Sequence, residues 1–274
     1  MKLITILLLL ATSAFSKTSN YYPQDVVDTF EESQLRDQEL KDLIHEVLVE
    51  YHQKHPGQQD TLRCNSKNSD CYKQRSNSYK TAKKILFGNL HLERNQYGEY
   101  EVFDVYCRKT FNETSKNIGS IGPGKVPNHT VVNCEHTWPQ SKFSSRFSSN
   151  LQKGDLHHLY PTDSKANSSR SSHDSGNVKN GKAPTSNCSA SAYGDRTYEP
   201  PDQHKGNVAR AMFYFSVRYK LPINSKMEKA LKLWHDQDPV DSEEQKRNDQ
   251  IYELQKNRNP FIDYPHLTDL IKNF

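Results

Sequence analysis

The sequence predicts an α+β fold in one large domain, and two observations indicate this class. Two short stretches rich in β-branched and aromatic residues, 100–107 and 129–136, indicate strands in the middle of the chain. Apolar residues recur at helical spacing before these strands and through much of the last third of the chain. The chain has 274 residues, enough for a sizeable core, and it shows no internal repeat and no linker rich in proline or glycine.

The first 16 residues have the pattern of a secretory signal peptide. Lys2 supplies a positive start, an apolar run covers 3–11, and small residues within 13–16 suit a signal peptidase. A membrane anchor is the alternative, but the run is far shorter than the ~20 apolar residues that a spanning helix needs. We therefore expect a signal peptide at 1–16 and a single secreted or periplasmic domain at 17–274, with no membrane attachment after cleavage.

Two helices are predicted before the strands. A spacing of three and four residues runs from Leu40 to Tyr51 and stops ahead of Pro56, which predicts a helix over this range. A second helix is predicted over 78–87, with Gly88 as its C-terminal stop. The residues up to about 77 carry less specific information about the fold than the rest of the chain.

The two predicted strands are separated by a loop with three glycines, 112–127. We expect the strands to form a hairpin across this loop. The stretch "GDLHHLYPTDSKANSSRSS" then predicts a short strand that turns at Pro161, followed by a helix capped by Thr162. That helix would carry Asp163, Asn167 and Arg170 on one face, although its Ser and Asn content makes it dependent on tertiary contacts.

The C-terminal third is predicted to be helical after a loop-like stretch at 176–201. "GNVARAMFYFSVRY" is apolar nearly all round, which predicts a buried helix. A second, amphipathic helix is marked by Met227 and Trp234. Ser242 with Gln245 fits a capping box, which predicts the start of a third helix.

Five cysteines in an exported chain predict at least one disulfide. Cys64 and Cys71 enclose a polar loop with no apolar residue, so a bridge between them is expected. The pairing of the other three, Cys107, Cys134 and Cys188, stays open, and the odd count leaves one thiol over.

The formal net charge of +4 permits an anionic partner without requiring one. A denser basic patch interleaved with Tyr72 and Tyr79 is either an exposed helix face or a contact for such a partner; it consists of Lys73, Arg75, Lys80, Lys83 and Lys84.

Candidate reactive side chains gather between residues 135 and 170. Glu135 and Asn167 offer the oxygen ligands that a hard divalent cation prefers. His136 can take a proton from water near neutral pH, and an arginine can hold an anionic oxygen. Neighbours on a regular strand point to opposite faces, so Glu135 and His136 share a site if the strand bends or ends there, and Pro139 favours an end. A lateral or water-mediated role for Glu135 is the alternative. The set suits metal-assisted hydrolysis of a phosphodiester.

Four long motifs, in the expected order, resemble the bacterial endonuclease I family. They are "NCEHTWPQSKF", "GDLHHLYPTDSKANSSRS", "YEPPDQHKGNVARAMFYFSVRY" and "NRNPFIDYP", and the resemblance covers about 78–265. The family consists of secreted or periplasmic non-specific DNases. The resemblance implies a ββα-metal (His-Me finger) core, with a small antiparallel sheet surrounded by many helices.

The resemblance also implies roles for individual residues. Glu135 and Asn167 would be metal ligands and His136 the general base, while Arg146 and Arg170 are both candidates for contacting the phosphate. The implied cofactor is Mg²⁺, with Mn²⁺ or Ca²⁺ as alternatives. His158 stands where some relatives have an asparagine, so it is not assigned a catalytic role.

The implied function is non-specific hydrolysis of DNA, and of RNA as well, to 5′-phosphate and 3′-hydroxyl ends. The protein would bind nucleic acid through its phosphates and act as a monomer. The alternative is a catalytically inactive, exported nucleic-acid-binding protein on the same fold. A metal-binding structural module is a more distant third possibility.

Overall fold

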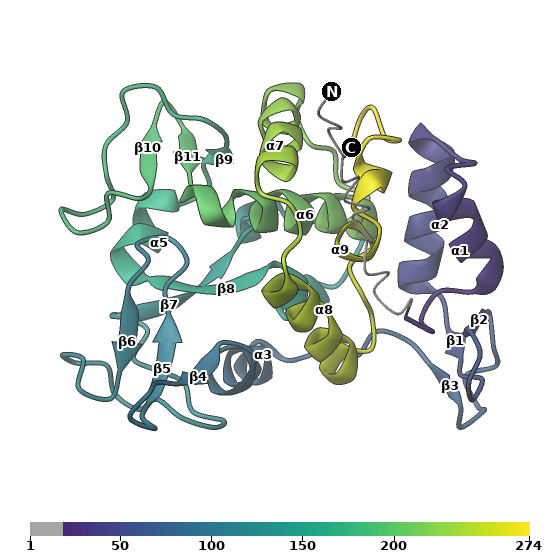
Figure 1. Cartoon of the computed structure of the whole chain (residues 1–274), viewed down its shortest axis with the longest axis horizontal. Coiled ribbons are helices and arrows are strands. Elements are labelled where there is room, and N and C mark those ends of the chain that lie inside the picture. The colour runs from purple at the N-terminus through teal and green to yellow at the C-terminus, as the bar shows by residue number, and fades with distance from the viewer. Residues whose placement is uncertain (1–18) are drawn as a thin grey trace, which may run out of the picture.

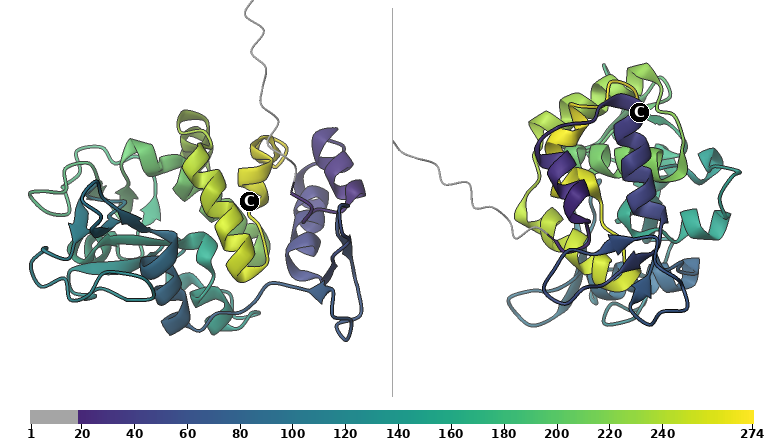
Figure 2. Two further views of the ribbon diagram at one scale, coloured as in Figure 1. Left: turned by 60° about the horizontal axis from the view of Figure 1, so that its bottom comes forward. Right: turned by 90° about the vertical axis from the view of Figure 1, so that its right-hand side faces the viewer.

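The computed structural model describes residues 19–274, and its helices and small sheets confirm the α+β class (Figure 1). The expected signal peptide at 1–16 lies outside these residues. A long buried helix, α6 (Asp202–Tyr219), runs through the middle of the molecule. The N-terminal helices lie at one end of it and most of the strands lie at the other (Figures 1 and 2). Within 19–274, no helix is both long enough and apolar enough to cross a membrane.

The N-terminal segment packs against the C-terminal end of the chain. It contains α1 (Gln24–Glu31), α2 (Asp37–Val49) and an antiparallel sheet of three two-residue strands, β1 (His52–Gln53), β2 (Thr61–Leu62) and β3 (Cys71–Tyr72). The amide of Asp37 donates to the carbonyl of Leu270 at 2.9 Å, and the Tyr22 hydroxyl donates to the Asp263 carboxylate at 2.6 Å. The helix predicted over 40–51 is confirmed as α2, which ends at Val49 because the backbone of Glu50 is already extended.

The helix predicted over 78–87 is confirmed as α3 (Tyr79–Ile85), but Gly88 does not stop it. The chain continues into a π-helical turn, Leu86–Leu90, that contains this glycine. A Cβ atom on Gly88 would lie 2.4 Å from the backbone nitrogen of Gly124, whose N–H donates to the Gly88 carbonyl at 3.2 Å. Gly88 therefore serves the close approach of two backbone segments rather than the end of a helix.

The hairpin predicted between 100–107 and 129–136 is wrong. The strands of the first region form their own antiparallel sheet, β4 (Leu92–Arg94), β5 (Tyr100–Phe103) and β6 (Thr110–Asn112). The second region becomes β7 (Val132–His136), which pairs with β8 (Leu159–Asp163) in a separate two-stranded sheet. Short connections close the β4–β5–β6 sheet at a smaller entropy cost than pairing across the long loop would need.

The strand β8 leads directly into α5 (Ser164–Arg170), and two local predictions are corrected there. Pro161 does not turn the chain; it sits inside β8 opposite Cys134. Proline is tolerated because both strands of a two-stranded sheet are edges. Thr162 does not cap the helix: Asp163 does, its Oδ1 accepting the amide of Lys165 at 2.8 Å and the amide of Ala166 at 3.1 Å.

Short strands also occur in the stretch 176–201 that was predicted as loop. β10 (Ala192–Gly194) pairs with β11 (Thr197–Glu199), and β11 pairs in parallel with β9 (Asp174–Ser175). Strands of two or three residues give too little alternation for a sequence pattern to reveal them.

The predicted C-terminal helices are confirmed, with one correction to a cap. They are the buried α6, then α7 (Ser225–Gln237), α8 (Ser242–Gln255) and α9 (Pro260–Asp263). The cap of α8 is Asp241, which accepts the amide of Glu244 at 2.8 Å, so Ser242 is the first helical residue rather than the cap. One further short helix, α4 (Ser149–Lys153), lies between β7 and β8 in the chain.

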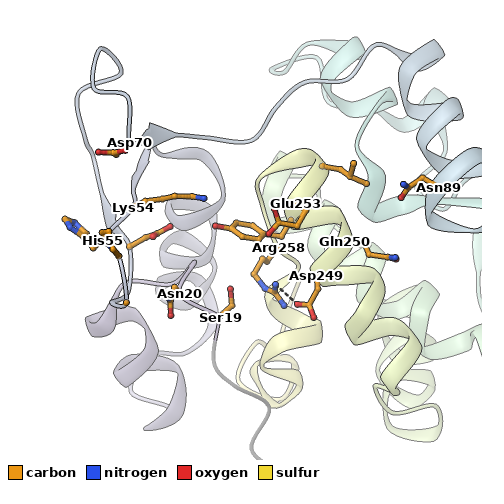
Figure 3. A pocket seen from close by; sticks show the side chains of 15 residues that line it. Ser19, Asn20, Lys54, His55, Asp70, Asn89, Asp249, Gln250, Glu253 and Arg258 are labelled. Carbon is orange, nitrogen blue, oxygen red and sulfur yellow. Dashed lines mark ion pairs between the residues drawn. The ribbon is translucent and has the colours of Figure 1, made fainter. Parts of the chain in front are cut away.

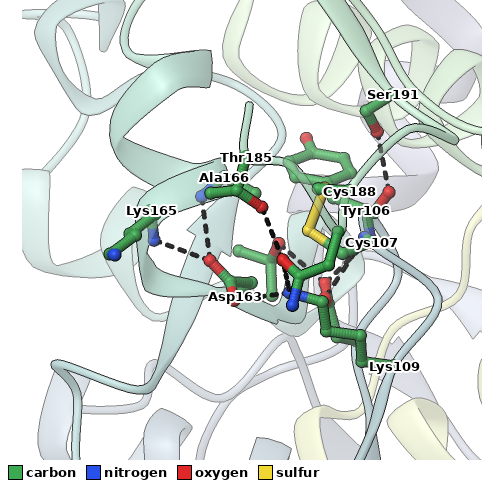
Figure 4. A network of polar contacts seen from close by, with 12 residues as sticks. Tyr106, Cys107, Lys109, Asp163, Lys165, Ala166, Thr185, Cys188 and Ser191 are labelled. Atoms are coloured by element: carbon green, nitrogen blue, oxygen red, sulfur yellow. Dashed lines mark hydrogen bonds and ion pairs between the residues drawn. A yellow bond between two sulfur atoms is a disulfide. The ribbon is translucent and has the colours of Figure 1, made fainter. Parts of the chain in front are cut away.

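Two disulfides settle the cysteine pairing. Cys64 and Cys71 are bridged as predicted. Cys107 is bridged to Cys188, 81 residues further on, and the buried Cys134 is the free thiol. The second bridge ties the segment after β5 to the loop before β10 (Figure 4).

The carboxylate of Asp155 is the centre of a buried polar network that joins several elements. It accepts hydrogen bonds from four side chains: Tyr219 at 2.7 Å, Tyr214 at 2.8 Å, Gln255 at 2.8 Å and Gln74 at 3.2 Å. Burial by itself raises the pKa of this carboxyl, but the neighbouring imidazoles and the donors outweigh it, and the pKa lies below its usual value. The network connects α6, α8 and the turn that leads into β8.

We expect Asp155→Asn to lower the free energy of unfolding at pH 7 by about 1.5–3 kcal/mol, because charge-assisted hydrogen bonds are lost. The pKa of Asp155 is lower in the folded than in the unfolded state. The stabilisation is therefore fully present above the unfolded-state pKa and is lost as the pH falls through the folded-state pKa. The difference between wild type and variant should therefore shrink below about pH 4. Urea unfolding at pH 7 and pH 3 measures it, with Asp236→Asn, at an exposed position, as the control. A difference that grows on acidification would contradict this role.

Candidate active site

The end of β7 and the helix α5 carry four of the five predicted site residues. β7 ends at His136, which still pairs with Leu159, and the two neighbouring side chains contact different groups: Glu135 contacts Tyr106 and Arg170, whereas the ring of His136 lies beside the rings of Tyr79 and Phe143. Because α5 follows β8 without a loop, and β8 pairs with β7, side chains of α5 lie against β7. Asn167 Nδ2 donates to the carbonyl of Cys134 at 3.4 Å, and Arg170 Nε contacts Glu135 Oε1 at 2.9 Å.

Glu135 is a buried carboxylate, only 2% exposed, with a fixed orientation. Its Oε1 accepts from Arg170 and from the Tyr106 hydroxyl at 3.0 Å. Burial raises the pKa of the Glu135 carboxyl, while the guanidinium of Arg170 and the hydroxyl of Tyr106 oppose that rise. Neither donor contacts Oε2, which is the oxygen of this side chain left for another cation.

The guanidinium of Arg170 is committed to protein groups. Besides Glu135, it donates from Nη2 to the Thr137 carbonyl at 2.6 Å and from Nη1 to the Ser171 carbonyl at 3.0 Å. Arg146 differs: it is exposed in the connection between β7 and α4, and it forms no ion pair within residues 19–274. Of the two arginines, the structure therefore ties Arg170 to Glu135 and leaves the charge of Arg146 available.

The imidazole of His136 has one fixed nitrogen and one available nitrogen. Its Nε2–H donates to the backbone carbonyl of Lys153 at 3.2 Å, since a carbonyl can only accept. The proton therefore lies on Nε2, and Nδ1 carries the lone pair, which accepts from the Gln140 amide at 3.3 Å. Burial, with help from neighbouring positive charge, holds the pKa of His136 well below its usual value. The ring is thus neutral near pH 7 and able to accept a proton at Nδ1.

A hard cation would find oxygen ligands at this site. Asn167 uses its amide nitrogen on Cys134, which leaves Oδ1 as its free donor atom, and Glu135 offers Oε2. Carboxylate and amide oxygens are the ligands that Mg²⁺, Mn²⁺ and Ca²⁺ accept. The chemistry of this donor pair therefore fits the cation expected from the sequence.

A second group of potential ligands, Asp104, Cys107 and Asp163, does not fit a metal ion (Figure 4). Cys107 is in a disulfide and offers no thiolate. Asp104 accepts from the Thr162 hydroxyl at 3.0 Å, and Asp163 caps α5 and pairs with Lys109 Nζ at 3.1 Å. These carboxylates already have protein partners that account for their positions.

Several residues that support the site were not identified from the sequence. Tyr106 orients Glu135 from 29 residues away, and the carbonyl of Lys153 orients His136 from 17 residues away. Neither contact leaves a local pattern in the sequence. Trp138, two residues after His136, stacks on Phe215 of α6 with ring centroids 5.3 Å apart. His158 donates to the Gln152 carbonyl at 2.9 Å within the core, which agrees with a structural role.

A large groove on the described surface lies away from these residues (Figure 3). It is a groove of about 910 Å³ between the N-terminal segment and α8. Lys54 and His55 line one side, and Asp249, Glu253 and Arg258 line the other (Figure 3). None of the predicted site residues lines it, so the candidate active site rests on its chemistry.

A neutral imidazole with a lone pair on Nδ1 is equipped to take a proton from water, and Glu135 and Asn167 offer oxygen ligands for a cation. Comparison with known proteins shows the family to which the chain belongs. A model of the Endonuclease I family matches residues 64–266, and the chain belongs to this family. The resemblance inferred from the four motifs is confirmed.

Individual relatives are nucleases. The chain is 38% identical over 179 residues to an extracellular ribonuclease of Bacillus amyloliquefaciens, covering 57% of this chain and 56% of the relative. It is 39% identical over 191 residues to an extracellular ribonuclease of Bacillus subtilis (strain 168), covering 61% of each. It is 31% identical over 116 residues to an extracellular deoxyribonuclease of Aeromonas hydrophila, covering 42% of this chain and 50% of the relative. The chain thus spans less than two thirds of these relatives.

We expect Arg170→Met to lower the free energy of unfolding by about 3–5 kcal/mol, because it leaves the Glu135 carboxylate buried without its counter-charge. The double variant Glu135→Leu/Arg170→Met removes both charges and should be markedly more stable than the single variant. Urea unfolding of the wild type and both variants measures this coupling. Equal stability of the single and double variants would mean that the ion pair does not hold α5 to β7.

Proposed function

We propose that the protein is a metal-dependent, non-specific endonuclease that acts outside the cell or in the periplasm. Its substrates would be DNA and RNA, cleaved to 5′-phosphate and 3′-hydroxyl ends. The observation that carries this proposal is the fixed tautomer of His136, with the proton on Nε2 and the lone pair on Nδ1, at the end of the strand that also carries Glu135. Relatives named as extracellular ribonucleases and deoxyribonucleases support both substrates and the location.

We further propose that β7, β8 and α5 form a ββα-metal core within one domain covering 17–274, after a signal peptide at 1–16. Two antiparallel strands followed at once by a helix support this assignment. In such a core the strand end carries the base and the helix carries a ligand. The positions of His136 at the end of β7 and Asn167 on α5 agree with these roles.

In the proposed mechanism, His136 Nδ1 accepts a proton from the water that attacks phosphorus. The Lys153 carbonyl keeps the other ring nitrogen protonated, so the acceptor atom is always the same one. Glu135 and Asn167 would hold the metal, and Arg170 keeps the Glu135 carboxylate in place. A bound divalent cation such as Mg²⁺ supplies Lewis-acid stabilisation of the charge on the phosphate and the leaving 3′ oxygen. Arg146, the exposed arginine, is the candidate to contact the phosphate.

The test is incubation of supercoiled plasmid and of single-stranded RNA with the purified protein, with Mg²⁺, Mn²⁺ or Ca²⁺ or with excess chelator. We expect nicking and RNA cleavage with at least one cation and neither with chelator. The 5′-phosphate ends of the cleavage products should be joined by a ligase to 3′-hydroxyl ends. Binding of both nucleic acids without cleavage under any cation would favour the inactive binding protein instead.

A set of three variants separates the base from the ligands. His136→Ala should lower kcat by roughly 10²–10⁴-fold, the contribution of general-base catalysis, and leave metal affinity nearly intact. Glu135→Ala and Asn167→Ala should weaken metal binding, and excess Mg²⁺ should restore part of the rate. Added imidazole should rescue only His136→Ala.

Metal titration by calorimetry and plasmid nicking measures these effects. His129→Ala, an exposed histidine before β7, is the matched control and should behave as wild type. If His136→Ala loses the metal while Glu135→Ala retains it, the assigned roles are wrong and His136 is a ligand.

A further inference from the structure

Tyr79, the first residue of α3, gathers two lysines around its ring. Lys83 Nζ lies 4.8 Å from the ring centroid and Lys153 Nζ lies 4.6 Å from it. Lys83 is four residues after Tyr79 on the same face of α3, whereas Lys153 comes from the end of α4. Both ammonium groups are attracted by the ring's negative face, which holds two charges of the same sign at one place.

This cluster of Tyr79, Lys83 and Lys153 adjoins the proposed base. The rings of Tyr79 and His136 have centroids 5.4 Å apart. Lys153 also contacts His136 through its backbone, since its carbonyl accepts the Nε2–H at 3.2 Å. One residue therefore orients the imidazole through its backbone and places a positive charge beside it through its side chain.

The two lysines lack a counter-charge. Within residues 19–274, neither Lys83 nor Lys153 forms an ion pair with a carboxylate, whereas six other lysines do. Two unpaired ammonium groups on one ring repel each other, and an anion between them would relieve that repulsion. The cluster is thus prepared for a negatively charged ligand.

The structure divides the basic patch that the sequence shows at 73–84. Lys73 lies over a different ring, that of Tyr51, at 4.3 Å. It follows β3, which lies far from α3 in both figures of the fold (Figures 1 and 2). Only the Lys83 part of the patch therefore adjoins the candidate active site, together with Lys153, which the sequence pattern did not include.

We propose that Tyr79, Lys83 and Lys153 form a subsite for the phosphate next to the one that is cleaved. This subsite rests on the proposed nuclease function and adds to it the residues that would hold the substrate strand. Both lysines and the His136 ring lie within 5.4 Å of the centroid of the Tyr79 ring, so these groups compete with a base for stacking on it. The subsite would read the nucleic-acid backbone and not the bases.

The test uses Lys83→Gln/Lys153→Gln, which removes both charges but keeps the backbone carbonyl that orients His136. Binding of a fluorescent DNA duplex is measured in excess chelator across a range of salt concentrations. We expect affinity to fall roughly tenfold, the equivalent of one lost charge-assisted contact. The slope of log affinity against log salt should become shallower by about 0.9. In cleavage assays with Mg²⁺, the loss of affinity should appear as a higher KM.

Lys73→Gln is the matched control, since it removes a lysine from a tyrosine ring in the same sequence patch but away from the site. It should bind with the affinity and salt slope of wild type. A double variant that keeps its fold, judged by its melting temperature, and still binds with the wild-type salt slope would overturn the subsite. Failure of the wild type to cleave any nucleic acid would instead refute the nuclease, and the binding series would still decide the subsite.

Two substitutions of Tyr79 test the part played by its ring. Tyr79→Phe keeps the ring that positions the lysines, so affinity should stay close to wild type. Tyr79→Leu removes the ring and should weaken the binding of duplex and of single-stranded nucleic acid to a similar extent. A loss confined to single-stranded substrate would show that Tyr79 stacks on a base, and would overturn the proposal.

Discussion

The buried ion pair between Glu135 and Arg170 is the contact on which the arrangement of the site depends. It joins the last turn of α5 to the end of β7, and Arg170 adds hydrogen bonds to two backbone carbonyls. α5 has only seven residues, six of them Ser, Asn, Lys or Arg, and so short a helix is not stable by itself. Because α5 begins directly after β8, fixing its far end also fixes Asn167 against β7.

Sequence patterns predicted the elements well where the signal was local. The helical spacing from Leu40 and the apolar run of α6 both correspond to observed helices. The pairing of strands was not predictable in the same way, because β7 pairs with a strand more than twenty residues away whose own signal is interrupted by Pro161. The glycine at 88 was misread for a similar reason, since its partner Gly124 is distant in the chain.

The candidate site shows the same contrast between what local sequence signals predict and what depends on distant contacts. Glu135, His136, Asn167 and Arg170 were predicted to act together; the structure pairs Arg170 with Glu135, places Asn167 against the backbone of β7 and puts His136 at the end of that strand. The groups that determine how they act were not predicted: the Tyr106 hydroxyl, the Lys153 carbonyl and the Gln140 amide come from other elements. Such contacts depend on the tertiary fold, and one sequence carries no record of them.

The packing of the N-terminal helices on the C-terminal end has a consequence for the order in which the protein can fold. Tyr22 and Asp37 find their partners, Asp263 and Leu270, only near the end of the chain. A ribosome makes these partners more than 200 residues after Tyr22 and Asp37, so the first helices remain without their packing surface until Asp263 and Leu270 have been synthesised. Contacts between such distant residues delay folding of the whole chain. The N-terminal helices should therefore be among the last elements of the molecule to reach their native packing.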